Sequence, residues 1–180
     1  EGKNTKEISR SHKVITSDNG LVTITGGKWT SYRLMAEDTV DKAIEVCGLP
    51  KRKCVTKKFR IHGYRKNPDL TDHMYVYGSD EPKILRLIEQ EPALGEKLSQ
   101  KFGYTLAEVV WAVREEMAIT LEDVLARRVR MLFVDAREAM AAAPKAAAIM
   151  ARELGRDQAW IDEQVKSFTD LAKNYIFEQK

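Results

Sequence analysis

Five consecutive residues, Gly26-Gly27-Lys28-Trp29-Thr30, are the part of the sequence whose types and order best suit chemistry. They follow a short run that alternates apolar and polar residues, and they precede a segment with helical spacing. Two glycines let the backbone approach a flat or anionic ligand where a Cβ atom would clash. The first amides of a helix lack partners within it and favour negative charge. The pattern therefore predicts a turn that presents N–H groups to an anionic or electron-rich group.

The same residues also have a plain structural interpretation. A strand, two glycines and a helix are typical of an ordinary tight turn in which Thr30 caps the helix. Arg33 can pair with Glu37, four residues further along the same helix. Arg10 lies in a polar stretch before the turn, where a solvated guanidinium is expected. Spacing alone leaves a binding site and a plain turn as alternatives.

The cysteines and histidines form no metal-binding pattern. Cys47 and Cys54 are the only cysteines, and they fit neither a zinc site nor a disulfide framework. We expect both to be reduced thiols. His12, His62 and His73 lie in unrelated contexts, and no ligand spacing connects them. No metal site is predicted.

A β-hairpin and a helix are expected to position the glycine turn. Residues 12–16 and 21–25 are rich in β-branched residues and alternate in polarity, with the hairpin signal Asn19-Gly20 between them. Residues 30–47 carry apolar side chains at helical spacing, and Gly48 provides the stop. A hairpin cannot bury enough apolar surface by itself, so this piece must pack on something else.

The rest of the chain becomes helical after residue 82. The capping-box pattern of Thr120 and Asp123 predicts a helix start, Pro144 suits the first turn of another helix, and Gly155 ends it. Trp111 and Trp160 are interpreted as core aromatics. The positions expected to face the core of this region include Leu106, Val109, Val110, Val113, Met117, Val124, Leu125, Phe168 and Ala172.

Two charged segments each have two interpretations. Residues 51–66 carry eight Lys/Arg and no acid, which fits a surface linker or a contact with lipid headgroups or nucleic acid. Glu115 and Glu116, with the arginines at 127, 128 and 130, fit ion pairs between helices better than a phosphate site. The predicted fold is mainly α, in three parts: a β-hairpin and helix over 1–48, a basic linker and loop over 49–82, and an all-helical domain of about five to six helices over 83–180.

Composition limits the classes of protein to consider. The 180 residues are 43% hydrophobic and 32% charged, which predicts a soluble globular chain. No apolar run reaches the length of a membrane span, and no signal-peptide pattern is present. A net charge of +3 is too small to indicate nucleic acid as a partner. Because the chain begins Glu1-Gly2 without methionine, we expect a piece of a longer protein.

Two motifs carry a resemblance to a known family. SRSHKVITSDNGLVTITGGKWTSYRLMAEDTVDKAI, residues 9–44, resembles the closing segment of the flavin domain in FAD-dependent glycerol-3-phosphate dehydrogenases. EVVWAVREEMAITLEDVLARRVRMLF, residues 108–133, resembles the helical C-terminal domain of the same family. The resemblance covers nearly the whole chain and is weakest over 51–105. It implies that residues 1–48 are the end of an α/β flavin-binding domain.

The resemblance also implies a reaction and a location for the whole protein. Such enzymes oxidise sn-glycerol 3-phosphate to dihydroxyacetone phosphate, FAD takes the hydride, and quinone reoxidises the flavin; related oxidases use oxygen. They are cytoplasmic and bound peripherally to the inner face of a bacterial cytoplasmic membrane. The resemblance makes Gly26, Gly27, Lys28, Trp29 and Thr30 contacts of the flavin, and it places Arg10 near the substrate phosphate, whose oxygens suit the planar guanidinium.

The chain departs from the family pattern in one large respect. It contains no G-x-G-x-x-G sequence to hold the FAD pyrophosphate, and the catalytic histidine and arginines of the family's substrate domain are absent. We therefore expect a soluble chain without bound FAD or activity of its own. The alternative function is a helical docking module for a subunit, a membrane surface or a protein partner. A nucleic-acid-binding regulator is the weakest alternative, and a homo-oligomer is left open.

Overall fold

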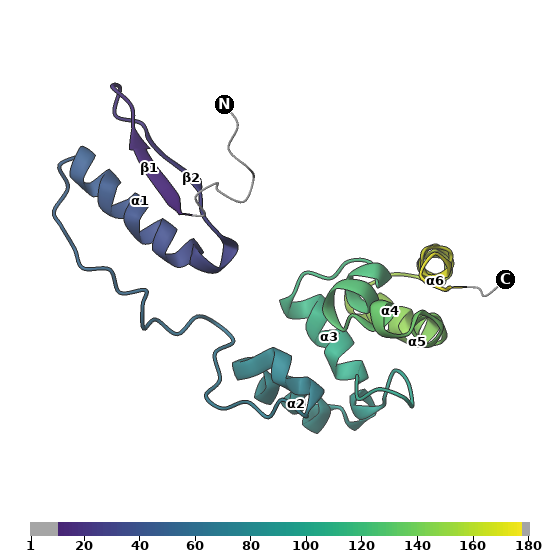
Figure 1. The fold of residues 1–180 in the computed structure, drawn as a ribbon. Helices are drawn as coiled ribbons and strands as arrows, with labels where there is room; N and C mark the ends of the chain where they lie inside the picture. Colours follow the sequence, from purple (N-terminus) through teal and green to yellow (C-terminus); the bar gives the residue numbers. More distant parts are fainter. Residues whose placement is uncertain (1–10, 178–180) are drawn as a thin grey trace. The chain divides into compact units, whose positions relative to one another are not determined.

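The computed structural model describes residues 11–177, which fall into two compact units. Of these residues, 11–61 belong to the first unit and 62–177 to the second. Figure 1 shows a hairpin with one helix in the first unit and a group of helices in the second.

The first unit is built on the predicted hairpin. Strands β1 (His12–Thr16) and β2 (Val22–Gly26) are antiparallel, and their register places His12 opposite Gly26. Gly20 in the connecting loop has φ +83°, a conformation that glycine adopts at no steric cost. The loop is closed by Ser17 N–H donating to the Leu21 carbonyl at 3.0 Å.

A short 3-10 turn joins the hairpin to its helix. The turn η2 covers Trp29–Ser31, and helix α1 covers Tyr32–Val46. Thr30 therefore lies inside the 3-10 turn, and the expectation that it caps the helix is wrong, because Ser31 occupies the N-cap position of α1. Helix α1 lies against both strands. No residue of the described range 11–61 is buried.

The second unit is helical, as its spacing predicted. Its described residues form five α-helices, within the expected range, together with two 3-10 helices and one π-helical segment. In chain order the elements are η3 (His73–Asp80), α2 (Glu81–Gln90), η4 (Pro92–Gly95), α3 (Leu106–Glu115), η5 (Asp123–Arg128), α4 (Met131–Val134), α5 (Ala136–Leu154) and α6 (Gln158–Lys173).

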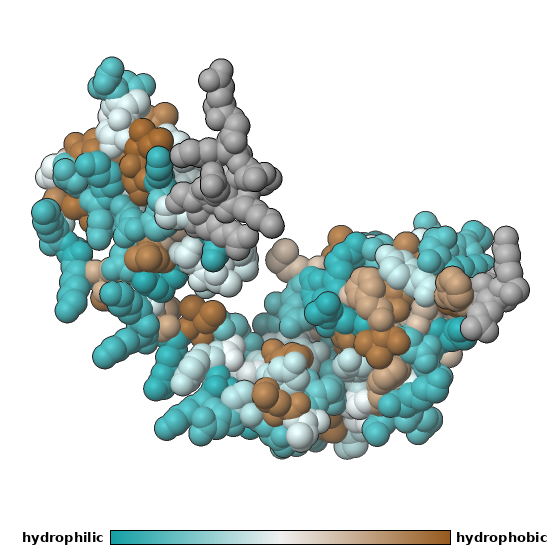
Figure 2. Space-filling view, in the orientation of Figure 1, coloured by the Kyte–Doolittle hydropathy of each residue, from teal (hydrophilic) through white to brown (hydrophobic). Residues whose placement is uncertain are grey.

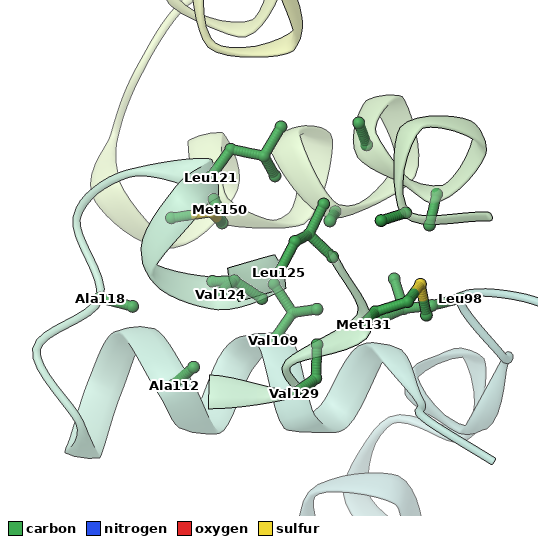
Figure 3. Packing of buried hydrophobic residues seen from close by; sticks show 14 of the residues in the cluster. Leu98, Val109, Ala112, Ala118, Leu121, Val124, Leu125, Val129, Met131 and Met150 are labelled. Atoms are coloured by element: carbon green, nitrogen blue, oxygen red, sulfur yellow. The ribbon is translucent and has the colours of Figure 1, made fainter. Parts of the chain in front are cut away.

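The core of the second unit lies where α3, η5 and α5 meet. Figure 3 shows Val109 of α3, Val124 and Leu125 of η5, and Met150 of α5 pointing toward one another. All four are fully buried. Phe168 and Ala172 of α6 join this cluster, and the face of α5 that meets it consists mostly of alanine: Ala136, Ala139, Ala142, Ala143, Ala146 and Ala147.

Several helix boundaries differ from the prediction. Met117 is not a core residue, because α3 ends at Glu115 and Met117 adopts a φ of +55° with 82% of its surface exposed. Pro144 does not begin a helix and lies inside α5. Gly155 ends α5 as expected, with φ +64°. The basic linker and loop predicted over 49–82 includes the 3-10 helix η3.

Candidate functional site

The two glycines of the predicted site hold a backbone conformation that other residues rarely adopt. Gly26 has φ +78° and Gly27 has φ +87°. A Cβ on Gly26 would lie 3.0 Å from the Ser11 carbonyl oxygen, and one on Gly27 would lie 2.6 Å from Met35 Sδ. The backbone conformation therefore favours glycine at both positions before any ligand is considered, and at Gly26 the nearby Ser11 carbonyl adds to this preference.

Three backbone amides, those of Lys28, Trp29 and Thr30, lie at the start of the helix, and one of them already donates a hydrogen bond within the turn. Lys28 N–H donates to Ser31 Oγ at 3.2 Å, and Ser31 Oγ donates to the Lys28 carbonyl at 2.8 Å. The next two amides, of Trp29 and Thr30, open the 3-10 turn, where a helix provides no acceptor. The Lys28 amide therefore already donates within the turn, whereas the predicted contacts of all five residues with a flavin stay a prediction.

The side chains around these amides are exposed. Trp29 has 87% of its surface exposed, and its ring stacks on Tyr32 with centroids 5.8 Å apart. Lys28 and Thr30 are exposed as well. One edge of a planar, electron-rich ligand could therefore contact the Trp29 and Thr30 amides, the Lys28 ammonium group and the Trp29 indole.

Sequence reasoning missed a hydrogen bond beside the turn. His12 Nε2 lies 2.6 Å from Asp38 Oδ2 and ties β1 to α1. The Cβ of His12 is also 3.3 Å from the position that a Cβ on Gly27 would take. The two residues are 26 positions apart, so no local pattern indicates the pair. This contact and the Met35 side chain hold the turn between strand and helix.

The structure places the two candidate arginines differently. Arg33 donates to Glu37 at 2.6 Å and to Thr56 Oγ1 at 3.0 Å, so the structural interpretation of Arg33 is confirmed. The bond to Glu37 raises the pKa of Arg33. Arg10, the predicted substrate contact, lies outside the described residues.

The acidic and basic cluster of the helical unit forms ion pairs. Arg127 pairs with Glu122 and Asp123 on its own segment, at 2.5 Å and 2.9 Å. Arg128 donates to the Glu116 carbonyl, and its Nε lies 3.7 Å from the Glu116 carboxylate. Burial raises the pKa of Glu116.

Two members of that cluster remain outside the pairs. Glu115 and Arg130 form no ion pair with a residue that the structure describes. Arg130 instead adopts a left-handed conformation, with φ +59°, at the start of α4. The cluster is thus largely a structural element.

A buried carboxylate is the second feature that sequence reasoning missed. Glu108 has its side chain fully buried, and it accepts hydrogen bonds from Tyr77 Oη at 3.0 Å and His73 Nε2 at 3.1 Å. Thr105 adds its N–H at 2.7 Å and its hydroxyl at 3.2 Å. The spacing Thr105-x-x-Glu108 is a capping-box signal that could have pointed to part of this arrangement.

The buried carboxylate sets the protonation of its neighbours. The hydrogen bond to Glu108 raises the pKa of His73, although partial burial works in the opposite direction. Burial, with the nearby carboxylate, raises the pKa of Tyr77 far above its usual range. Both groups therefore stay proton donors to Glu108, which joins η3 to α3. No group of three or more His, Cys, Asp or Glu that could hold a metal ion occurs within residues 11–177.

The comparisons with known proteins agree with the architecture. The fold is a mainly helical region that carries a hairpin–helix unit, as the resemblance implied. Residues 23–161 match the family described as the C-terminal domain of alpha-glycerophosphate oxidase, and the chain belongs to this family.

The relatives are longer than this chain and carry consistent names. The chain is 34% identical over 195 residues to a probable mitochondrial glycerol-3-phosphate dehydrogenase of Caenorhabditis elegans, with 97% of this chain and 26% of the relative covered. A probable mitochondrial glycerol-3-phosphate dehydrogenase of Dictyostelium discoideum is 32% identical, with 97% and 29% covered. The mitochondrial enzyme of Mesocricetus auratus is 34% identical, with 96% and 26% covered. The chain thus spans less than a third of these relatives, and the resemblance to this group is confirmed.

Proposed function

We propose that this chain is part of a flavoenzyme that oxidises sn-glycerol 3-phosphate to dihydroxyacetone phosphate. The family and the names of the relatives support this reaction. The observation that carries the proposal is the turn at residues 26–30, which joins two left-handed glycines to exposed amides. FAD, when bound, would accept the hydride.

The residues of the turn would hold the pyrimidine end of the flavin. The Trp29 and Thr30 amides would donate to its carbonyl oxygen, and the positive end of the helix would favour the electron density gained on reduction. The Lys28 ammonium would add to this charge. The Trp29 indole would cover one edge from water. Arg10 would bind the substrate phosphate.

The remaining contacts of the flavin are proposed to come from the part of the relatives that this chain does not span. We infer that the chain alone neither binds FAD nor turns over substrate. Quinone is the proposed electron acceptor, because the relatives are named dehydrogenases. Oxygen is the alternative, because the family is named after an oxidase.

The whole protein is proposed to lie peripherally on the cytoplasmic face of a bacterial respiratory membrane, although the relatives carry mitochondrial names. No helix within residues 11–177 is both long and apolar enough to cross a membrane. Whether the protein forms a homo-oligomer is left to sedimentation measurements on the whole protein.

A first experiment tests whether this chain retains FAD. The purified chain is mixed with excess FAD, passed through a desalting column, and examined for visible flavin absorption. We expect a colourless protein. Flavin near one equivalent per chain would contradict the proposal that the site is incomplete.

A second experiment tests the turn within the whole protein. Trp29→Pro removes both the indole and the Trp29 N–H, whereas Trp29→Ala removes only the indole. Lys28 is extended (φ −120°, ψ 150°), which is the conformation that a residue before proline prefers. We expect Trp29→Pro to hold FAD about five- to tenfold more weakly than Trp29→Ala, the loss of one hydrogen bond.

Measurements of flavin reduction and reoxidation in the same whole protein distinguish quinone from oxygen as the electron acceptor. Glycerol 3-phosphate should reduce the flavin of the unsubstituted protein, and a quinone analogue should reoxidise it faster than oxygen does. Equal FAD affinity in the two Trp29 variants would contradict a role for the amide. Release of hydrogen peroxide at the rate of substrate oxidation would favour the oxidase.

A further inference from the structure

His12 faces the glycine turn from strand β1. In the register of the hairpin it pairs with Gly26, and its Cβ lies 3.3 Å from the position that a Cβ on Gly27 would take. From the other side, Met35 Sδ of α1 lies 2.6 Å from the same position. Gly27 is therefore held between the end of the strand and the first turns of the helix.

The His12 side chain extends past Gly27 to the helix. Its Nε2 lies 2.6 Å from Asp38 Oδ2, and only 15% of the side chain is exposed. Asp38 follows Met35 by three residues, so both lie on the face of α1 that meets the hairpin. Because an ionised carboxylate only accepts hydrogen bonds, Nε2 carries the hydrogen of this bond. One charge-assisted hydrogen bond thus fastens the strand end to the helix across the turn.

Within this chain, the strands rest on α1 through partly exposed side chains and this bond. Figure 2 shows apolar side chains among hydrophilic ones on the visible face of the first unit, and no residue of the described range 11–61 is buried. Gly26 belongs to β2, and Trp29 follows it by three residues. A shift of the strand end along the helix would therefore carry the turn and its amides with it.

We propose that His12 and Asp38 are a positioning pair for the flavin contact, because their hydrogen bond sets where the amides of residues 29 and 30 lie. The inference rests on the proposed function, since it takes these amides as donors to the flavin carbonyl. An N–H···O bond weakens steeply when its distance or angle leaves the favoured range. The positive end of a helix interacts more strongly with added negative charge. Displaced amides would therefore weaken binding of the reduced flavin more than binding of the oxidised one.

The first measurement follows the turn in the intact chain without flavin. His12→Ala removes the bond, and His12→Gln keeps an N–H donor of similar reach. Lys42→Ala is the control, because it breaks a 3.0 Å ion pair with Glu45 on the same helix, away from the turn. Residual dipolar couplings report how the N–H bonds of Trp29 and Thr30 are oriented relative to α1. We expect these couplings to change in the alanine variant of His12 but to stay near their original values in the glutamine variant and the control.

The second measurement uses the whole protein and FAD. We expect His12→Ala to weaken binding of oxidised FAD about fivefold, in line with one hydrogen bond. Reduced FAD should lose about threefold more affinity than oxidised FAD, which lowers the two-electron reduction potential by about 15 mV. A change confined to the stability of the fold would leave this potential unaltered. His12→Gln should restore most of both the affinity and the potential.

The two residues are also tested as a pair in the whole protein. Asp38→Ala should weaken FAD binding about as much as His12→Ala does. The double variant should weaken it no further, because either change alone removes the same bond. Two independent effects would instead multiply to about 25-fold. Circular dichroism checks that all variants fold.

Three results would overturn the inference. Unchanged FAD affinity and potential in His12→Ala, while Trp29→Pro still binds FAD more weakly than Trp29→Ala, would keep the turn as the flavin contact and remove the pair from it. A loss in the double variant equal to the product of the two single losses would show that the residues act separately. Equal FAD affinity in the two Trp29 variants would contradict the flavin contact itself and, with it, the role of the pair.

Discussion

The hairpin–helix unit and the helical unit contain similar amphipathic elements, but only the helical unit encloses a core. In residues 62–177, Val109, Leu125 and Met150 are shielded completely. In residues 11–61 no residue is buried, and Ile15, Leu34 and Val40 are all exposed. The two units differ in the number of helices and strands that pack together to cover apolar side chains.

This difference reflects how much packing surface each unit has to cover its apolar side chains. Two strands and one helix offer too little surface to cover each other's apolar faces, whereas the helices of the second unit cover each other. Within this chain, the glycine turn and the apolar side chains Tyr32 and Val40 of α1 are therefore exposed. Both are surfaces suited to contacts with other molecules or with other parts of a longer protein. The helical unit buries a core in addition, although side chains such as Ile119, Phe133 and Val134 remain exposed on it.

The largest expected contrast is in hydrogen exchange. Amides such as those of Val110 and Leu125 should exchange only through global unfolding, while the Ile24 amide should exchange through local opening. We expect the two to differ by on the order of 5 kcal/mol in opening free energy, measured by NMR on the intact chain. Equal protection in both units would show that the hairpin–helix unit has a stable core after all.

A smaller contrast is expected from truncating one side chain in each unit. Leu125→Ala should lower the free energy of unfolding by about 2–5 kcal/mol, because it leaves a cavity in a closed core. Val40→Ala, at an exposed position of α1, should change it by less than about 0.5 kcal/mol. Urea denaturation measures both, and a similar cost for the two would contradict the comparison.

Substitutions at two glycines distinguish the free-energy cost of a strained backbone conformation from that of a steric clash. Gly155→Ala has open space around its Cβ but a φ of +64°, so about 1 kcal/mol of backbone strain is expected. Gly27→Ala has a similar strain and also brings its Cβ within 2.6 Å of Met35 Sδ, so the end of Met35 must shift and a larger loss of order is expected in the first unit. NMR peak intensities of residues 12–46 measure this loss. If the second unit also lost structure in Gly27→Ala, the two units would not be independent.

The smallest effect concerns pH and the helical unit. The hydrogen bond to Glu108 raises the pKa of His73 in the folded chain. A group with a raised folded pKa stabilises fully below its unfolded pKa, about 6.5 for histidine, and loses that contribution as pH rises through the folded value. We expect the free energy of unfolding to be higher at about pH 6 than at about pH 8.5, by roughly 1 kcal/mol.

The control for this effect is His73→Gln, which keeps a donor without the titration. The charges of Asp72 and Lys97 also act on the imidazole, Asp72 raising its pKa and Lys97 lowering it, so they belong to the same balance. The variant should show a smaller difference in unfolding free energy between the two pH values. An unchanged difference would assign the pH dependence to other groups.

Local signals predicted much of this fold. Asn19-Gly20 marked the hairpin, and the capping box of Thr120 and Asp123 is present, with Asp123 accepting from the Thr120 N–H at 2.9 Å. Gly155 ended its helix because glycine adopts a positive φ without strain. These features depend on residues a few positions apart.

Features that depend on distant residues were missed. The His12–Asp38 bond and the Glu108 cluster join segments 26 to 35 residues apart, and no spacing rule connects such pairs. Pro144 was misjudged because a proline is usually a helix start, whereas packing of the flanking alanines keeps α5 continuous through it. In the candidate site, the sequence predicted the glycines and the amides but not that Ser31 occupies the Lys28 amide.

The alanine face of α5 has a consequence for how this chain can change over evolutionary time. Small side chains let neighbouring helices approach closely, so a larger side chain at Ala143 or Ala146 would have to push a helix away. Glycine, the smaller alternative, would weaken the helix. Substitution at these positions is therefore expected only together with a compensating change on a facing helix. The pairs of positions that vary in concert among family members should map this face.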